Sequence, residues 1–126
     1  MLRNILIVDD SPVMRRIMIQ TLKDCGFNIL PIEATNGKDA LSKFSLRGVH
    51  MVMSDWNMPV MDGLEMVREL RKIDPTNLVP IVMFTTQANQ NKVVEALKTG
   101  IQDYIVKPYT VEVVKAKLSK YFEGDI

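Results

Sequence analysis

Residues 5–12, with the sequence ILIVDDSP, set a pattern that the rest of the chain repeats. The four apolar residues, three of them β-branched, are typical of a strand that is covered on both faces. Two aspartates end this run, and Ser11-Pro12 then pairs a good N-cap with a proline at the first helical position. The stretch therefore predicts a buried strand, an acidic strand end and a helix, with Arg15, Arg16 and Lys23 of the helix facing water.

The same order recurs four more times along the chain. Further apolar runs, each a predicted strand, lie at residues 29–34, 49–53, 79–84 and 104–106. Segments with helical spacing of apolar side chains follow them, with expected starts at Asn36, Gly63 and Thr110. A further helical segment is expected from the spacing of Val93, Val94, Leu97 and Ile101. Pro31 lacks an amide donor, so its run belongs at a sheet edge or at a bulge.

This alternation of strands and helices predicts the fold class. It implies parallel strands joined by right-handed crossovers, and hence a doubly wound α/β sandwich of three layers with five strands and five helices. An eight-unit barrel would also alternate, but it needs about 250 residues and the chain has 126. We expect residues 1–126 to form a single domain.

Composition and charge argue against several function classes. The 16 basic and 15 acidic side chains leave a net charge of +1, so no broad electrostatic footprint for nucleic acid or a membrane surface is expected. No apolar run approaches the ~18 residues of a membrane span, and no leader-like segment opens the chain. The single cysteine, Cys25, is expected in the core, in keeping with a reducing compartment. We expect a cytoplasmic monomer that neither inserts into a membrane nor binds nucleic acid.

Polar residues gather at the expected carboxyl ends of the strands, where open α/β sheets place their chemistry. These ends read Asp9-Asp10, Ser54-Asp55, Thr85-Thr86 and Lys107-Pro108. The carboxylates at one edge would repel one another, by ~4 kcal/mol for two unit charges 4 Å apart at an effective dielectric constant of 20. Lys107 compensates one charge, and hard oxygen ligands without histidine or thiolate favour Mg²⁺ over zinc.

These groups together indicate phosphoryl transfer. A divalent cation, a lysine and a hydroxyl neutralise a phosphoryl group during transfer, and an aspartate can itself be the nucleophile. Asp55 suits that role because it ends the central strand, whereas Asp9 and Asp10 are better placed as metal ligands. Taken singly, each residue could instead be a cap, a turn residue or a surface charge. Their joint occurrence at the strand ends favours the functional interpretation.

The ordered set of motifs resembles one protein family. It comprises Asp9-Asp10, the stretch Asp55-Trp56-Asn57-Met58-Pro59 followed by Asp62-Gly63, then Thr85 and Lys107-Pro108. In this order the motifs are similar to the receiver domain of two-component response regulators over essentially the whole chain, and most of all to the stand-alone chemotaxis members. The resemblance implies a flavodoxin-like sheet with strand order 2-1-3-4-5 and no output domain.

The resemblance also implies how the acidic residues work. Asp55 would accept the phosphoryl group from the phosphohistidine of a histidine kinase. Mg²⁺ would be bound by Asp10, Asp55 and the backbone carbonyl of Asn57, and by Asp9 through a metal-bound water. Such a domain is not an enzyme in the usual sense, because it promotes only its own phosphorylation and dephosphorylation.

Further roles implied by the resemblance concern the response to phosphorylation. Thr85 and Lys107 would hold phosphoryl oxygens, with a cis peptide bond between Lys107 and Pro108. Tyr104 lies where the family has a switch aromatic, which would rotate as the Thr85 hydroxyl moves inward. The last two helices and the last strand would form the face that binds a flagellar motor switch protein, with basic residues at Lys92, Lys115, Lys117 and Lys120.

Asn57 and Gln87 would tune the hydrolysis of the acyl phosphate, with a phosphatase as a further partner. Trp56, next to the acceptor, is expected over the site. His50, the single histidine, lies far from the strand ends and is expected to have a structural or surface role.

Three other functions fit part of the pattern. A flavin or dinucleotide module shares the architecture, but its first turn needs glycine and exposed amides where this chain has Asp9-Asp10. A metal-dependent phosphatase with an aspartyl-phosphate intermediate needs a general acid, which Asn57 cannot supply. A phosphorelay intermediate, which passes the phosphoryl group to another protein's histidine, stays open.

Overall fold

A five-stranded parallel sheet forms the centre of the protein in the computed structural model, which describes residues 2–46, 48–86 and 90–122. The strands are β1 (Arg3–Val8), β2 (Ile29–Ala34), β3 (Met51–Asp55), β4 (Ile81–Thr85) and β5 (Asp103–Val106). They lie in the order β2-β1-β3-β4-β5, and all neighbours pair in parallel. The predicted fold class and the strand order implied by the resemblance are confirmed.

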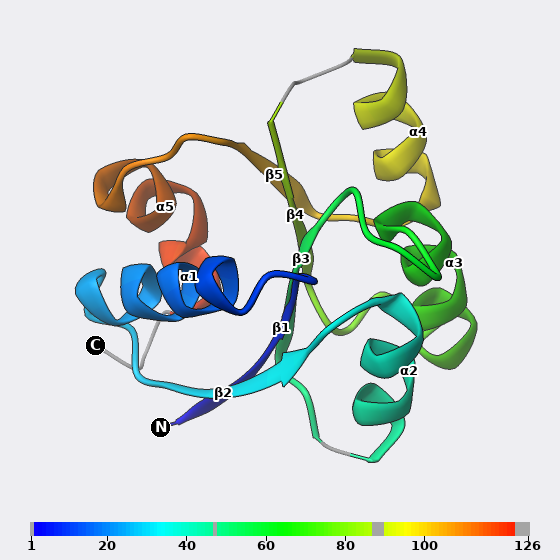
Figure 1. Cartoon of the computed structure of the whole chain (residues 1–126), viewed down its shortest axis with the longest axis horizontal. Helices are drawn as coiled ribbons and strands as arrows, with labels where there is room; N and C mark the ends of the chain where they lie inside the picture. The colour runs from blue at the N-terminus through cyan, green and yellow to red at the C-terminus, as the bar shows by residue number, and fades with distance from the viewer. Residues whose placement is uncertain (1, 47, 87–89, 123–126) are drawn as a thin grey trace.

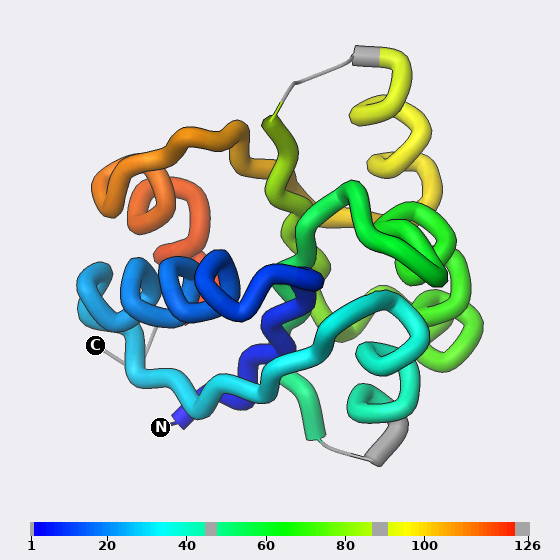
Figure 2. Tube along the Cα trace, viewed as in Figure 1, coloured from blue at the N-terminus to red at the C-terminus, as the bar shows by residue number. Residues whose placement is uncertain are grey.

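Five α-helices of the described residues cover the two faces of this sheet. They are α1 (Pro12–Asp24), α2 (Gly37–Leu46), α3 (Gly63–Ile73), α4 (Gln90–Thr99) and α5 (Val111–Leu118), with a short 3-10 helix, η1 (Ser119–Tyr121), after α5. Figure 1 shows α1 and α5 on one side of the sheet and α2, α3 and α4 on the other. The trace in Figure 2 passes repeatedly from the central sheet to the flanking helices and back. The result is the expected three-layer sandwich.

Short polar residues start the helices where the sequence predicts them. The hydroxyls of Ser11 and Thr110 and the side-chain carbonyl of Asn36 each accept a hydrogen bond from the amide three residues on, at 3.2, 3.2 and 2.8 Å. Each cap satisfies a backbone donor that the first helical turn leaves unpaired. Three of the predicted helix starts are therefore confirmed in their hydrogen bonding.

Two hydrophobic clusters, one on each face, hold the helices to the sheet. Successive side chains of β1 point to opposite faces, so Ile5 and Ile7 pack under α1 and α5, whereas Leu6 and Val8 pack under α2, α3 and α4. All four are at most 1% exposed, which explains the unbroken apolar run in the sequence. Cys25 packs in the first cluster, as predicted.

Two strands begin and end slightly later in the chain than we predicted from the apolar runs. β3 covers Met51–Asp55 rather than 49–53, and β4 covers Ile81–Thr85 rather than 79–84. The reason is that apolar packing extends beyond the hydrogen-bonded ladder, so Val49 is buried before β3 begins. Asp55 and Thr85 therefore lie within the sheet ladder, where they pair with Phe84 and Val106. Rigid strands rather than loops position these two residues.

Two structural expectations about the sheet are also confirmed. The strand that contains Pro31 is an edge strand, paired on one side with β1. His50 immediately precedes β3, and its Nδ1 accepts a hydrogen bond from the Asn4 amide at 2.8 Å. This contact lies at the amino end of β3, away from the carboxyl ends of the strands, and gives His50 a structural role.

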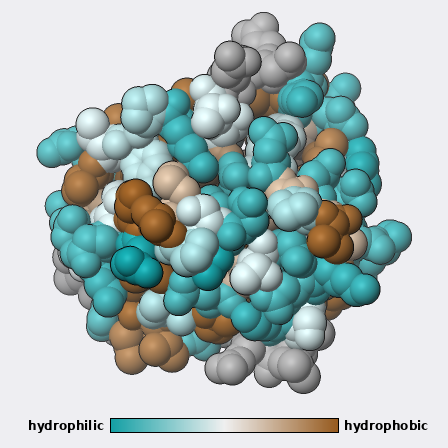
Figure 3. Space-filling model, in the orientation of Figure 1, coloured by the Kyte–Doolittle hydropathy of each residue, from teal (hydrophilic) through white to brown (hydrophobic). Residues whose placement is uncertain are grey.

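The surface carries no extended apolar band in the view of Figure 3, where small hydrophobic patches are separated by hydrophilic side chains. Among the described residues, no helix is both long enough and apolar enough to cross a membrane.

Candidate functional site

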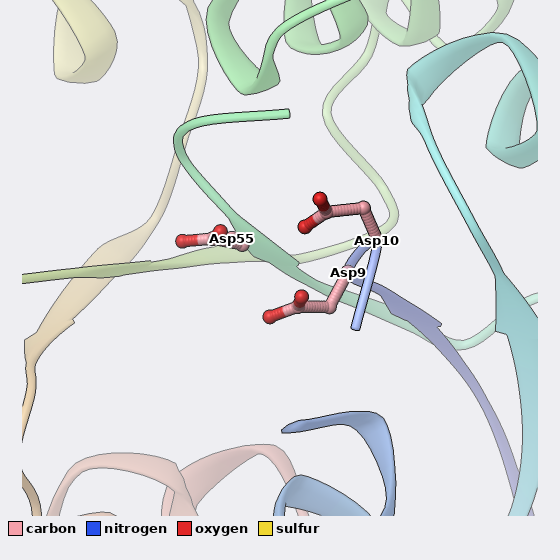
Figure 4. A group of neighbouring side chains, drawn as sticks. All are labelled: Asp9, Asp10 and Asp55. Carbon is pink, nitrogen blue, oxygen red and sulfur yellow. The ribbon is translucent and has the colours of Figure 1, made fainter. Parts of the chain in front are cut away.

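Three aspartates meet beyond the carboxyl ends of β1 and β3. Asp9 and Asp10 follow β1, and Asp55 is the last residue of β3. Val8 pairs with Ser54, which brings these two neighbouring strand ends level. Carboxylate oxygens of the three aspartates lie within 4.8 Å of one another, and Figure 4 shows the side chains directed into a common space. The predicted convergence of these carboxylates is confirmed.

Asp9 is the most buried of the three, with 2% of its surface exposed. Its Oδ1 accepts a hydrogen bond from the Ser11 amide at 2.9 Å, whereas its Oδ2 has no hydrogen-bond partner among the described residues. Burial raises the pKa of this carboxyl above its ordinary value, and the negative charges of Asp55 and Asp10 raise the pKa further. The hydrogen bond from the Ser11 amide and the charge of Lys107 lower the pKa, but they do not outweigh the other effects. A buried carboxylate oxygen without a donor is costly, so a cation at this position would be stabilised.

Lys107 is a cation that the structure places on this cluster. Its Nζ lies 3.3 Å from Asp55 Oδ1 and 3.7 Å from Asp9 Oδ2, and 13% of its side chain is exposed. One ammonium group thus faces two carboxylates, with Asp10 close by, and the cluster keeps an excess of negative charge. The peptide bond between Lys107 and Pro108 is cis, as the resemblance implied.

Thr85 ends β4 next to Asp55 in the sheet. It is 8% exposed, and it directly follows Phe84, which pairs with Asp55. The Thr85 carbonyl accepts a hydrogen bond from the Lys107 amide at 2.7 Å. This bond ties the ends of β4 and β5 together, so Asp55, Thr85 and Lys107 come from three consecutive strands, as the sequence predicted.

The start of α3 packs closely against the end of β3. The Gly63 amide donates to the Trp56 carbonyl at 2.9 Å. A Cβ atom on Gly63 would lie 2.9 Å from the Asp55 carbonyl oxygen and 2.3 Å from Met83 Cε, so only glycine permits this approach. Asp62 is the N-cap of the helix. The tight junction fixes the strand end that carries Asp55.

Arg15 is a residue at the site that the sequence analysis misplaced. We expected it to face water, but its side chain is 12% exposed, and its guanidinium donates to the Asp9 carbonyl at 2.7 Å and pairs with Glu33 at 2.9 Å. Helical periodicity identifies the apolar face of α1, but it does not show that a long side chain at the border of that face reaches a neighbouring strand end. The expectation for Arg15 was therefore wrong.

The acidic pocket fits a hard divalent cation. Its three possible ligands are carboxylates, and one of them, Asp9, has an oxygen without a donor among the described residues. Magnesium prefers such oxygen ligands completed by water, whereas zinc sites usually include histidine or cysteine. The charge of Lys107 does not balance the three aspartates. The residues present are therefore able to bind Mg²⁺.

Other residues singled out in the sequence lie around the cluster. Asn57 is exposed in the segment between β3 and α3, two residues beyond Asp55. Trp56 is 7% exposed and packs in the hydrophobic cluster under α2, α3 and α4. We expected its indole over the site, but the apolar ring is instead buried beside it. Gln87 lies outside the described residues.

Tyr104 lies in the edge strand β5, two residues before Val106, which pairs with Thr85. Its ring is half-buried and packs against the cluster under α2, α3 and α4. The two helices α4 and α5 and the strand β5 also expose apolar side chains, each 41–48% exposed, at Val94, Leu97, Val106 and Val113. Contiguous apolar patches mark protein-binding surfaces, whereas single exposed apolar side chains are ordinary, so these four side chains do not by themselves define a binding surface.

Comparisons with known proteins agree with this geometry. The family model described as the response regulator receiver domain matches residues 5–119. The chemotaxis protein CheY-3 of Vibrio cholerae serotype O1 is 40% identical over 119 residues, which cover 94% of this chain and 91% of the relative. Among solved structures, the chemotaxis response regulator CheY4 of Vibrio cholerae has a TM-score of 0.85 and 31% identity, covering 96% of this chain and 99% of its own. A chain of the CheX–CheY–BeF₃–Mg²⁺ complex from Borrelia burgdorferi has a TM-score of 0.83 and 28% identity. The match covers 94% of this chain and 89% of that chain.

Proposed function

Because the chain belongs to the response regulator receiver domain family, we propose that it is a phospho-acceptor of a two-component system and that Asp55 is the acceptor. The observation that supports Asp55 best is its combination of access and charge contact. Its side chain is 16% exposed and touches Lys107, whereas Asp9 is buried and Asp10 is exposed. A nucleophile must be reached by the phosphodonor and must lie beside a group that neutralises the incoming charge.

In the proposed reaction, a carboxylate oxygen of Asp55 attacks the phosphorus of a phosphohistidine on a histidine kinase. The new oxygen–phosphorus bond forms while the phosphorus–nitrogen bond breaks. The ring, protonated on its other nitrogen, takes the electron pair of that bond and leaves as neutral imidazole. The Lys107 ammonium is proposed to hold a phosphoryl oxygen, and its distance of 3.3 Å from Asp55 Oδ1 supports this role. The Thr85 hydroxyl is proposed as the second such group. Catalysis of this kind depends on positioning and on charge neutralisation.

We assign the Mg²⁺ ligands to Asp10, Asp55 and the backbone carbonyl of Asn57, with Asp9 acting through a bound water. When bound, the ion supplies charge neutralisation for the phosphoryl oxygens. The excess of carboxylates supports this assignment, as does Asp9 Oδ2, which accepts no hydrogen bond from the described residues. The solved Borrelia complex contains Mg²⁺ and BeF₃, which supports Mg²⁺ as the ion of the proposal. Asn57 and Gln87 are proposed to set how fast the acyl phosphate is hydrolysed.

The proposed output is a change in partner binding at the face formed by α4, β5 and α5. Phosphorylation would draw the Thr85 hydroxyl inward, and the half-buried Tyr104 ring would follow. The Vibrio relatives are chemotaxis proteins, so a flagellar motor switch protein is the partner we propose first. The Borrelia relative forms a complex with CheX, so a second partner, such as a phosphatase, belongs to the proposal. The proposed place of action is the cytoplasm.

The acceptor is tested by labelling with [³²P]acetyl phosphate. We expect wild-type protein to be labelled in the presence of Mg²⁺ and to stay unlabelled in EDTA, and Asp55→Asn to stay unlabelled in both. Asp10→Ala should be labelled poorly, whereas Asp62→Asn, which keeps an N-cap side chain outside the cluster, should be labelled like wild type. Label retained in Asp55→Asn would contradict the assignment. Continuous hydrolysis of a phosphomonoester that depends on Asp55 would favour a phosphatase instead.

The output is tested separately with a peptide from a flagellar switch protein. We expect BeF₃⁻ and Mg²⁺ to tighten binding of this peptide to wild-type protein, and to have no effect on Asp55→Asn. If the peptide binds equally with and without BeF₃⁻, while the phosphoryl group moves to the histidine of a phosphotransfer domain, the protein is a relay intermediate instead.

A further inference from the structure

Lys117 of α5 makes an unusual set of contacts with the first residues of β5. Its Nζ donates to Asp103 Oδ1 at 3.0 Å and to the Tyr104 carbonyl at 2.9 Å, and it lies 4.8 Å from the centre of the Tyr104 ring. Asp103 Oδ1 also accepts a hydrogen bond from the Tyr104 amide at 2.7 Å. The ammonium is therefore held by two oxygens and stands over the ring of the proposed switch residue.

These contacts connect the two faces of the sheet. The Tyr104 ring packs with the cluster under α2, α3 and α4, whereas α5 lies on the opposite face (Figure 1). Lys117 thus reaches across the edge strand to the ring. Its side chain is 36% exposed, and Lys115 and Lys120 of the same segment are more exposed. The two hydrogen bonds therefore keep the Lys117 ammonium over the Tyr104 ring.

We propose that Lys117 is a positioning residue for Tyr104. Its contacts with the ring and with Asp103 stabilise the ring position seen in this structure, which we take as the resting position, against the position that the ring takes after phosphorylation. This inference rests on the proposed function, in which Tyr104 moves when the charge at Asp55 changes. The cation–π attraction expected at a half-exposed position corresponds to about a two- to fivefold change in an equilibrium constant. Loss of Lys117 should shift the ring equilibrium by that factor.

Linkage makes this shift measurable without any partner protein. A ligand that favours the second ring position binds more tightly once the resting position is weakened, by the same factor. We therefore propose to titrate the protein with BeF₃⁻ at saturating Mg²⁺ and to follow the fluorescence of Trp56, the single tryptophan, next to Asp55. Lys117→Met should lower the half-saturating BeF₃⁻ concentration about two- to fivefold, and Lys117→Arg, which keeps the cation, should stay near wild type.

The chain supplies a control in a lysine that has no part in the proposed site or binding face. Lys72 of α3 is 75% exposed and pairs with Glu69 of the same helix. Lys72→Met removes a charge of the same kind from a different helix, so it tests whether charge alone matters. We expect its BeF₃⁻ titration to match wild type. An equal effect of Lys72→Met and Lys117→Met would overturn the inference.

A direct measurement of the ring separates this inference from the proposed function. With 3-fluorotyrosine at the three tyrosines, the ¹⁹F resonance of Tyr104, assigned by Tyr104→Phe, should move on addition of BeF₃⁻ and Mg²⁺ to wild type. No movement would contradict both the switch role of Tyr104 and the inference. Movement in wild type, together with an unchanged BeF₃⁻ titration in Lys117→Met, would contradict the inference alone. If Lys117→Met does not fold, Lys117→Gln replaces it with the same expected outcomes.

Discussion

At the scale of single residues, we expect the buried carboxylate of Asp9 to destabilise the folded protein when no cation neutralises it. Burial raises the pKa of Asp9 in the folded protein, because the buried carboxylate is harder to ionise than the same group in the unfolded chain. Ionisation of Asp9 therefore lowers the free energy of unfolding. That cost is fully present above the folded-state pKa and disappears as the pH falls below the unfolded value of about 3.9. In EDTA at pH 7, we expect Asp9→Asn to be more stable than wild type by about 1 kcal/mol.

Urea unfolding measures this effect. The advantage of Asp9→Asn should shrink between pH 7 and pH 4, and the exposed neighbour variant Asp10→Asn should change stability by less than about 0.5 kcal/mol. If Asp9→Asn unfolds at the same or a lower urea concentration than wild type at pH 7, the buried charge of Asp9 does not destabilise the folded protein.

Four site residues found in the sequence, Asp9, Asp55, Thr85 and Lys107, share the property that they end or directly follow a strand. Asp9, Asp55 and Thr85 could be predicted because parallel strand ends meet at one edge of the sheet. The contacts of Arg15 and Lys117 could not, because both depend on where a long side chain from a helix reaches after the layers have packed. Helical periodicity contains no information about that reach.

At the scale of elements, the junction of β3 and α3 depends on Gly63. A methyl group there would come within 2.9 Å of the Asp55 carbonyl oxygen, which is backbone and cannot move aside independently. We expect Gly63→Ala to lose about 2 kcal/mol of stability. Gly48→Ala is the matched control, because a Cβ at Gly48 would meet nothing within 4 Å.

Chemical denaturation of the two glycine variants checks this expectation, and a Mg²⁺ titration shows whether the strand end has moved. Gly63→Ala should also bind Mg²⁺ more weakly, since Asp55 shifts with its backbone. Equal stability of Gly63→Ala and Gly48→Ala would show that the close approach is not needed.

The C-terminal end of α3 is fixed by a buried ion pair. Arg71 contacts Asp74 at 3.0 Å and also donates to the Gly100 carbonyl at 2.7 Å, joining α3 to the segment before β5. Burial alone would raise the pKa of Asp74, but the amides of Val79 and Leu78 and the charge of Arg71 outweigh it, so that the pKa lies below its ordinary value. Ionised Asp74 therefore stabilises the folded protein above the unfolded pKa of about 3.9.

We expect Asp74→Asn to lose about 2 kcal/mol at pH 7, because Arg71 is left buried without its counter-charge. The difference from wild type should persist down to about pH 5 and diminish as the pH falls through the folded-state pKa. Urea unfolding at several pH values measures this difference in stability. The control is Glu69→Gln, which removes the carboxylate of the Lys72–Glu69 ion pair of the same helix. A loss that stays constant into strongly acidic solution would exclude the ionised carboxylate as its cause.

Element boundaries show the limit of prediction at this scale. The caps at Ser11, Asn36 and Thr110 could be read from the sequence because a cap is a local hydrogen bond. The extents of β3 and β4 could not, because the ladder of a strand is set by its neighbours, whereas burial continues beyond it. The Arg71–Gly100 contact joins residues 29 apart and had no local signal.

At the scale of the whole molecule, the proposed Mg²⁺ site couples to global stability. A ligand that binds only the folded state adds about 2.7 kcal/mol at one hundred times its dissociation constant. We expect Mg²⁺ to raise the thermal midpoint of wild type, and Asp10→Ala to lose most of this gain. Thermal unfolding scans at matched ionic strength measure the gain in the thermal midpoint. An equal Mg²⁺ effect in wild type and Asp10→Ala would exclude Asp10 as a ligand.

Lys107→Ala should remain folded but should accept a phosphoryl group poorly.

The central claim is that the acidic end of the sheet receives a phosphoryl group on Asp55. A crystal structure of the protein grown with Mg²⁺ and BeF₃⁻ tests it most directly. We predict a BeF₃ group bonded to a carboxylate oxygen of Asp55, in contact with Lys107 and Thr85, and a metal ion beside Asp10. Density for BeF₃ at another residue, or an acidic pocket without BeF₃ and metal at saturating concentrations of both, would contradict the claim.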